Sequence, residues 1–251
     1  MHVLSGLVSH GRLVPAALAV AGLAVGAGGT AVVLSGSGSG HVVSMPVAGR
    51  GSATLEVTSG TPVLTITVAR LGGTLLRVST PDSAPVRPVL SGSAPAPVVL
   101  SLVGAGSGGT AGDQGHSAPY AVSVVLSSAV VWNLDLAAGT QRTSADLRGG
   151  RVGAITVTAG SDILDLTLPR PARTVALRLT GGASQFLVSL PGGVPAEVTV
   201  GGGASYVTVD GQSRIGVAGG TVLTSAGWST ATSRFDIDAI AGVSRLTVSR
   251  W

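Results

Sequence analysis

One short segment recurs along the chain at nearly constant intervals. Three copies in the second half read AGSDILDLTLP (159–169), GGASQFLVSLP (181–191) and GGASYVTVDG (202–211). When the chain is aligned on one glycine of each copy, three further segments share the register. The six glycines are Gly60, Gly139, Gly160, Gly182, Gly203 and Gly242. The four central ones are 21 or 22 residues apart, a period typical of one supersecondary unit that stacks on its copies.

The residues around each glycine alternate between apolar and polar. Five and three residues before the glycine, all twelve residues are apolar. Four, six and eight residues after it, fifteen of eighteen are apolar, and the exceptions are Thr143, Gly211 and Arg250. The positions between these carry Thr, Ser or Asp, except for Leu187. A period of two predicts strands with one buried face, so each unit is expected to be a strand, a glycine-centred turn and a second strand.

Two all-β architectures accommodate such units. The equal offsets favour a β-solenoid of short strands, similar to a single-stranded β-helix, in which each coil buries its apolar face by stacking on the next coil. A β-sandwich of recurring hairpins is the alternative. The glycines would allow a positive φ at the corner between strands. The register places Val188 in the core between Leu166 and Val209 of the neighbouring coils, and Ser189 in solvent.

The repeat divides the chain into regions. Residues 131–251 are the C-terminal repeat array, and residues 48–130 are an N-terminal β region that contains the first unit. Within this region, residues 81–119 hold six of the thirteen prolines, which predicts an insertion around one possible strand, PVVLSLVG. Residues 35–47, which begin with SGSGSG, are expected to be a flexible linker. Residues 1–34 are expected to be an N-terminal membrane anchor or signal segment.

The N-terminal region contains a long apolar segment. Leu13–Leu34 has no charged residue over 22 positions, enough for a helix of about 33 Å that would cross a bilayer. Arg12 precedes the segment and no Lys or Arg follows before Arg50, which predicts a cytoplasmic N-terminus. We therefore expect a protein of the cell membrane whose C-terminal domain is extracytoplasmic. A cleaved signal peptide, which would leave a secreted protein, is the alternative.

The composition limits the partners. The chain has no cysteine, so it has neither a disulfide framework nor a thiolate metal site. All 15 basic residues are arginines, and they are scattered, which argues against nucleic acid. A net charge of +4 supports only a weak attraction to anionic polymers or headgroups. We expect contact with the membrane through the N-terminal segment and with a cell-wall polymer or an envelope protein, and the oligomeric state is open.

Residues that could catalyse a reaction are not grouped in the sequence. The four histidines are His2, His10, His41 and His116. None of them lies in a predicted strand, which argues against a histidine triad or a zinc site. The run GAGSGG at Gly104–Gly109 has no lysine after it and is interpreted as a flexible loop rather than a phosphate-binding loop.

Carboxylates offer the best catalytic candidates. The aspartates at outward positions are Asp146, Asp165, Asp210, Asp236 and Asp238. A glycosidase needs two carboxyls about 5–10 Å apart in a groove, and nothing in the sequence groups these residues, so we interpret them as solvated strand charges. Asp236 and Asp238 could hold a calcium ion weakly. We predict no catalytic residue, no cofactor, no bound metal and no enzyme activity.

Two stretches of the sequence resemble a known family. The array that begins GSDILDLTLP and the closing FDIDAIAGVSRLTVSR resemble the putative-adhesin or "toastrack" domains of bacterial envelope proteins. The resemblance covers residues 130–251, with a fainter echo at 52–78, and the closing segment is similar to the end of such domains in actinobacteria. It implies a β-solenoid at the cell envelope, with a role in adhesion or envelope sensing and no catalytic residues.

Three functions follow as hypotheses. The first is a membrane-anchored extracytoplasmic β-solenoid that acts as a non-catalytic adhesion, interaction or structural module of the cell envelope. The second is an accessory or sensor subunit for envelope stress or for a membrane partner. The third is a polysaccharide-active enzyme, which would require carboxylates that converge in a groove.

Overall fold

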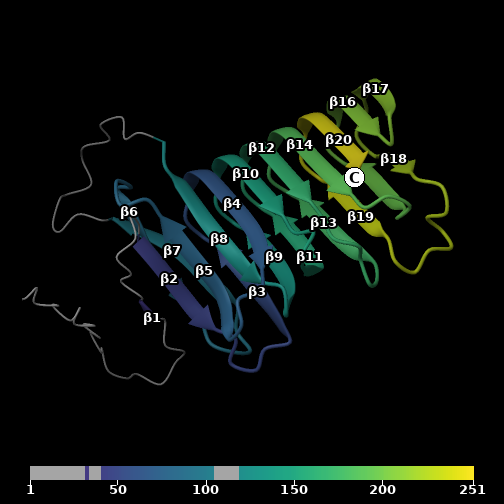
Figure 1. The fold of residues 1–251 in the computed structure, drawn as a ribbon. Coiled ribbons are helices and arrows are strands. Elements are labelled where there is room, and N and C mark those ends of the chain that lie inside the picture. Colours follow the sequence, from purple (N-terminus) through teal and green to yellow (C-terminus); the bar gives the residue numbers. More distant parts are fainter. Residues whose placement is uncertain (1–31, 34–40, 105–118) are drawn as a thin grey trace, which may run out of the picture.

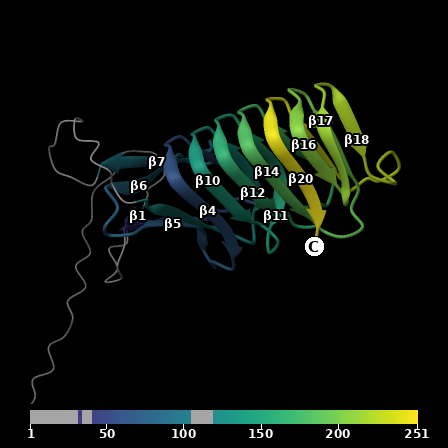
Figure 2. The same ribbon diagram turned by 90° about the horizontal axis from the view of Figure 1, so that it is seen from above.

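The computed structural model describes residues 32–33, 41–104 and 119–251, in which every regular element is a strand. The strands form two sheets, of eleven and nine strands, that face each other along an elongated stack (Figure 1 and Figure 2). Apolar side chains from both sheets meet between them in one continuous core. The expected all-β class is confirmed, and both sheets are mixed but largely parallel.

Six two-strand units have the register that the glycine alignment predicts. They are β3/β4 (Ser52–Val57 and Thr61–Ala69), β9/β10 (Val131–Leu136 and Thr140–Asp146), β11/β12 (Arg151–Val157 and Ser161–Thr167), β13/β14 (Val175–Leu179 and Ala183–Leu190), β15/β16 (Ala196–Val200 and Ala204–Val209) and β19/β20 (Phe235–Ala239 and Val243–Arg250). Leu164 of β12, for example, is in register with Thr143 of β10 and Phe186 of β14. The two strands of a unit belong to different sheets, so they do not form the hairpins of the sandwich alternative.

The spatial order of the units differs from their order in the sequence. β20 lies between β14 and β16 and is parallel to both, as the yellow strand in Figure 1 shows. β19 lies in the same way between β13 and β15. Val188 is therefore in register with Leu166 and Val248, and the expected contact with Val209 is wrong. On the side of β15/β16 toward the end of the stack lie two antiparallel strands, β18 (Thr221–Thr224) and β17 (Gln212–Val217). On the side toward the middle of the stack lies the last unit, β19/β20.

A further unit extends the stack at its other end. The predicted strand in PVVLSLVG is confirmed as β7 (Val98–Gly104), which is parallel to β3. β8 (Ala121–Ser127) is parallel to β4. Antiparallel strands complete this end, and they are β1 (Val32–Val33), β2 (His41–Pro46), β5 (Thr74–Thr80) and β6 (Val86–Ser91). The two strands within residues 81–119, β6 and β7, thus belong to the nine-stranded sheet and continue the row of repeat strands.

The glycines at the corners have a different role from the predicted one. Of the six aligned glycines, only Gly203 has a positive φ, of 82°. The others approach the backbone of the next unit, and a Cβ on Gly60 would lie 3.1 Å from the Gly139 carbonyl oxygen. That carbonyl accepts a hydrogen bond from the amide of Thr61 at 3.4 Å. Glycine is favoured at Gly60 and Gly139 because a Cβ there would lie 3.1 and 3.3 Å from the carbonyl oxygen of the neighbouring corner, and not because the turn is left-handed.

Burial follows the predicted alternation. Val188 is 1% exposed, whereas Ser189 is partly exposed on the outer face. The bulkiest fully buried side chains are those of Trp132, Phe186 and Phe235. Thr143, an exception to the apolar pattern, is also buried, and its hydroxyl is 2.8 Å from that of Thr140. A polar group is tolerated at this inward position because it has a hydrogen-bond partner.

The expected membrane segment Leu13–Leu34 lies outside the described residues, apart from the two residues of β1. His41–Pro46, at the end of the expected linker, form β2. Among the residues that the structure describes, none belongs to a helix that is long and apolar enough to cross a membrane.

Candidate functional site

The five outward aspartates lie on two opposite faces of the stack. Asp146 of β10 and Asp165 of β12 are on the outer face of the eleven-stranded sheet. Asp236 and Asp238 of β19 are on the outer face of the nine-stranded sheet. Asp210 directly follows β16. Because the core separates the two faces, the five carboxylates do not converge on one place. Asp146 and Asp165 lie two register positions apart on neighbouring strands, and Asp236 and Asp238 lie two residues apart on one strand.

Two acidic pairs do lie side by side on the nine-stranded sheet. Asp236 of β19 is in register with Glu197 of β15, and Glu56 of β3 is in register with Asp135 of β9. Side chains in such positions start about 5 Å apart. Neither pair was predicted, although the members of each pair lie at the same distance before their aligned glycines. A glycosidase holds its carboxyls on either side of a sugar in a groove, whereas each of these pairs projects from a single face.

Of the four histidines, the structure describes His41 alone. His41 begins β2, so the expectation that it lies outside a strand is wrong. His2, His10 and His116 lie outside the described residues, as does the glycine-rich run after Gly104. Within residues 41–104 and 119–251, no group of three His, Cys, Asp or Glu side chains is placed to hold a metal ion.

Asp146 is paired with a neighbour in the turn after β10. Nη2 of Arg148 lies 2.6 Å from Oδ2 of Asp146, and the hydrogen bond from Arg148 lowers the pKa of the Asp146 carboxyl. About half of each side chain is exposed, and exposed ion pairs contribute little to stability. Asp146 is thus a paired surface charge.

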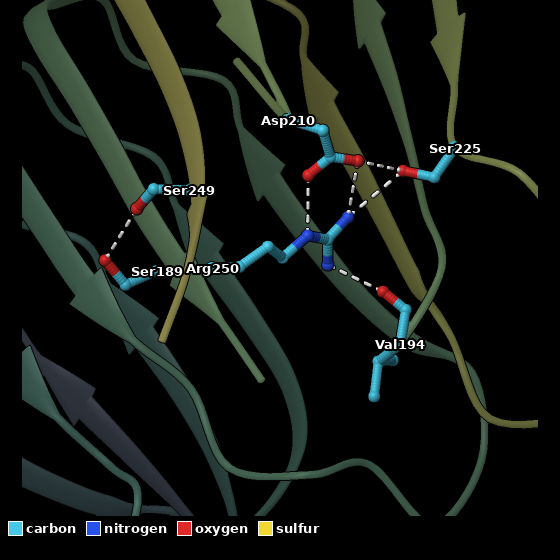
Figure 3. Close-up of polar contacts among 6 residues, drawn as sticks. All are labelled: Ser189, Val194, Asp210, Ser225, Ser249 and Arg250. Carbon is cyan, nitrogen blue, oxygen red and sulfur yellow. Dashed lines mark hydrogen bonds and ion pairs between the residues drawn. The ribbon is translucent and has the colours of Figure 1, made fainter. Parts of the chain in front are cut away.

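A network around Arg250 joins four segments near the C-terminal end of the stack (Figure 3). The guanidinium of Arg250 donates to both carboxylate oxygens of Asp210, at 2.6 and 2.9 Å. It also donates to the Ser225 hydroxyl at 3.1 Å and to the Val194 carbonyl at 2.6 Å. The Ser225 hydroxyl donates to Asp210 at 2.8 Å. This Arg250 network ties β20 to the segments that follow β16 and β18 and precede β15, and so holds the inserted unit in place.

The chemistry of the Arg250 network favours a structural role. The hydrogen bond from Arg250 is the main cause that lowers the pKa of Asp210, and a carboxylate with a lowered pKa is a weak base for activating the Ser225 hydroxyl. One residue of this network stands out in the sequence. Arg250 is an exception to the apolar register, and an arginine at an inward position requires acceptors.

A depression on the outer face of the eleven-stranded sheet gathers an aromatic ring, a guanidinium, an amide and three hydroxyls. It has a volume of about 380 Å³ and is lined by Ser184, Gln185, Ser205, Tyr206, Ser244 and Arg245. We call it the Tyr206 depression. Its residues are the second and third after the aligned glycines that directly precede β14, β16 and β20. The depression exists because β20 lies between β14 and β16, which the sequence order does not reveal.

Tyr206 and Arg245 face each other on neighbouring strands of this depression. They are in register, and Cζ of Arg245 lies 5.6 Å from the centroid of the Tyr206 ring. Hydrogen bonding to Ser213, and to a smaller extent to Thr208, lowers the pKa of the Tyr206 hydroxyl. Among the described residues, the Arg245 guanidinium forms neither an ion pair nor a hydrogen bond. The depression therefore presents an unpaired cation stacked on an aromatic ring.

A second depression adjoins the first at Ser184. It has a volume of about 300 Å³ and is lined by Thr140, Gly160, Ser161, Asp162, Gly182, Ala183 and Ser184. The hydroxyls of Thr140 and Ser161 are 3.0 Å apart. Together the two depressions cross β10, β12, β14, β20 and β16, a distance of about 19 Å at the usual strand spacing. We call these two adjoining depressions together the corner groove.

Comparison with known proteins identifies a similar fold. No family model matches the chain, and no curated protein matches it. A solved structure from Clostridium sporogenes, described as "a putative cell adhesion protein", matches with a TM-score of 0.63. The match covers 84% of this chain and 99% of that chain, at 14% sequence identity. At this identity the similarity shows a shared fold, and it agrees at that level with the expected likeness to adhesin domains.

Proposed function

We propose that the chain is a non-catalytic β-solenoid module of a bacterial cell envelope, of the actinobacterial type that its closing segment resembles, and that it acts in adhesion or interaction. Its N-terminal segment anchors it in the membrane, and the stack lies outside. The observation that carries the proposal is the similarity in fold, over 84% of the chain, to a protein described as a putative cell adhesion protein.

The geometry of the stack supports this proposal. In-register strands present equivalent outward positions at intervals of about 4.8 Å along one axis. An extended partner can contact several of these positions at once, and repeated weak contacts combine into a strong attachment. The corner groove runs along the same axis over five strands.

Membrane anchorage is proposed from the sequence. The charge-free Leu13–Leu34 segment, and the absence of Lys and Arg between Arg12 and Arg50, support insertion with the stack on the outer side.

An attachment assay tests the function. Cells that lack the gene, cells complemented with the full chain and cells complemented with its Val188→Asp variant are compared for attachment to cell-wall material and to one another. We expect attachment to fall on deletion and to return only with the unaltered chain, because the variant disrupts the core. Equal attachment of deletion and parental cells would contradict the proposal.

Polysaccharide cleavage is the second candidate, because Asp236 and Glu197 are in register. We expect the purified chain to release no reducing sugar from cell-wall polysaccharides, since both carboxylates project from one face. Release that is lost on Asp236→Asn substitution would favour the enzyme. A sensor or accessory subunit would instead co-purify with a membrane protein.

A further inference from the structure

We infer that the Tyr206 depression binds an anionic unit of a linear cell-surface polysaccharide, with Arg245 contacting a carboxylate or phosphate and Tyr206 contacting the sugar ring. The inference rests on the proposed adhesion function and names the ligand class of that surface.

The first argument is the state of Arg245. Three described arginines lie over an aromatic ring, and they are Arg148, Arg234 and Arg245. Arg148 is paired with Asp146, and Arg234 donates to the Thr174 hydroxyl and the Trp228 carbonyl. Arg245 has no such partner among the described residues and is exposed on the outer face. A guanidinium is a planar fork of N–H donors that matches carboxylate and phosphate oxygens two at a time. The Tyr206 ring orients this fork, so less side-chain freedom is lost when an anion binds.

The second argument is the polar lining around that cation. Ser184, Ser205 and Ser244 occupy the same repeat position on three neighbouring strands, and each hydroxyl can both donate and accept a hydrogen bond. The Gln185 amide adds two donors and an acceptor. A sugar presents hydroxyls of the same dual character together with a C–H face that packs on an aromatic ring, so this lining matches a sugar.

The third argument is the shape and charge of the corner groove. The adjoining depression continues from Ser184 across β12 to β10, which gives room for further units of a linear chain. Asp162 lines that part and disfavours a second anion there. The groove therefore suits an anionic unit at Arg245 followed by uncharged units, because like charges repel.

Binding measurements on the purified full-length chain test the inference. The probes are polygalacturonate, which carries carboxylates, poly(glycerol phosphate), which carries phosphates, and neutral dextran. We expect one of the two anionic polymers to bind at least ten times more tightly than dextran in calorimetric titrations, and its identity distinguishes a carboxylate ligand from a phosphate ligand. Arg245→Gln should weaken this binding about tenfold or more, and Tyr206→Leu should weaken it severalfold.

Arg142→Gln is the matched control. Arg142 is exposed in the same row of the same face, three strands from Arg245, and it does not line either depression. Its substitution should change the affinity by less than twofold, and thermal melts should show equal folding of the two arginine variants. Equal loss in both variants would overturn the inference in favour of diffuse charge attraction. Failure of both anionic polymers to bind would overturn it too, while the attachment assay would still decide the adhesion function by itself.

Discussion

Replacement of Val188 by Asp probes the inward register of the whole stack. Val188 is 1% exposed and packs between Leu166 and Val248 in consecutive strands of the eleven-stranded sheet. Burial of a valine side chain stabilises the fold by about 1.5–3 kcal/mol, which the substitution removes. The introduced carboxyl has no partner in this apolar row, and an unsatisfied buried polar group costs about 1–3 kcal/mol even when it is neutral.

The loss should grow with pH. Burial raises the pKa of the introduced carboxyl in the folded state above its value of about 4 in the unfolded chain. The unfolded chain therefore releases a proton that the folded chain keeps, and stability falls by up to about 1.4 kcal/mol per pH unit between the two pKa values. The two terms add to a loss of about 2.5–6 kcal/mol at pH 4. Since a domain is stable by about 5–15 kcal/mol, the further loss toward pH 7 leaves little stability there.

The matched control is Ser189→Asp, one residue away on the outer face. The Ser189 hydroxyl is 3.0 Å from that of Ser249 in an exposed setting, so a carboxylate there stays hydrated and the change should be within about 0.5 kcal/mol. Urea unfolding of both variants at pH 4 and pH 7 measures the difference. Equal stability of the two variants would refute the inward and outward assignment of the unit, and by the shared register that of every other unit.

Two further substitutions test the Arg250 network and the corners. Asp210→Asn should lower the free energy of unfolding at pH 7 by about 1 kcal/mol, a modest value because the Asp210 side chain is 36% exposed. The pKa of Asp210 is lowered in the folded chain. The stabilisation by the pair is therefore present above the unfolded pKa of about 3.9 and is lost as the pH falls through the folded pKa. A difference in stability between the variant and the unaltered chain that persists unchanged in strong acid would contradict the pairing with Arg250. Gly181→Ala would place a methyl group against the backbone of Ala159 and should cost about 1–3 kcal/mol, whereas Gly73→Ala enters open space and should be nearly neutral in thermal melts. A Gly181→Ala variant that melts at the same temperature as the Gly73→Ala variant would show that the corners are not closely packed.

The register of the units was predictable because side-chain direction alternates strictly along a strand. Leu164 and Leu168, two positions on either side of Leu166, share its buried face, and the glycine alignment transfers that face to the other units. The alternation does not extend to the corner, where Asp162 is exposed. The strand at Val98–Gly104 was predicted from its apolar run between proline-rich and glycine-rich segments, without the help of the alignment. The glycine φ angles were predicted less well, because a sequence does not distinguish a left-handed turn from a close approach of two backbones, and Gly60 is an example of the second.

The order of the units was not predictable, and the Tyr206 depression depends on it. All six units carry the same apolar pattern, so β20 fits equally well beside any of them, and the pattern contains no information about which neighbour it takes. Tyr206 and Arg245 are 39 residues apart in the sequence and become neighbours only because β20 pairs with β16. The Arg250 network was more accessible, since Arg250 breaks the apolar register in a way that demands a partner.

Exposure of the stack on the outside of the cell tests the proposed function most directly. Protease is added to intact cells, and an antibody against the repeat units follows the chain, with a cytoplasmic protein as the integrity control. We expect the repeat units to be lost from intact cells while the control protein stays whole. Full protection of the repeat units in intact cells, with digestion only after lysis, would contradict an extracytoplasmic adhesion module.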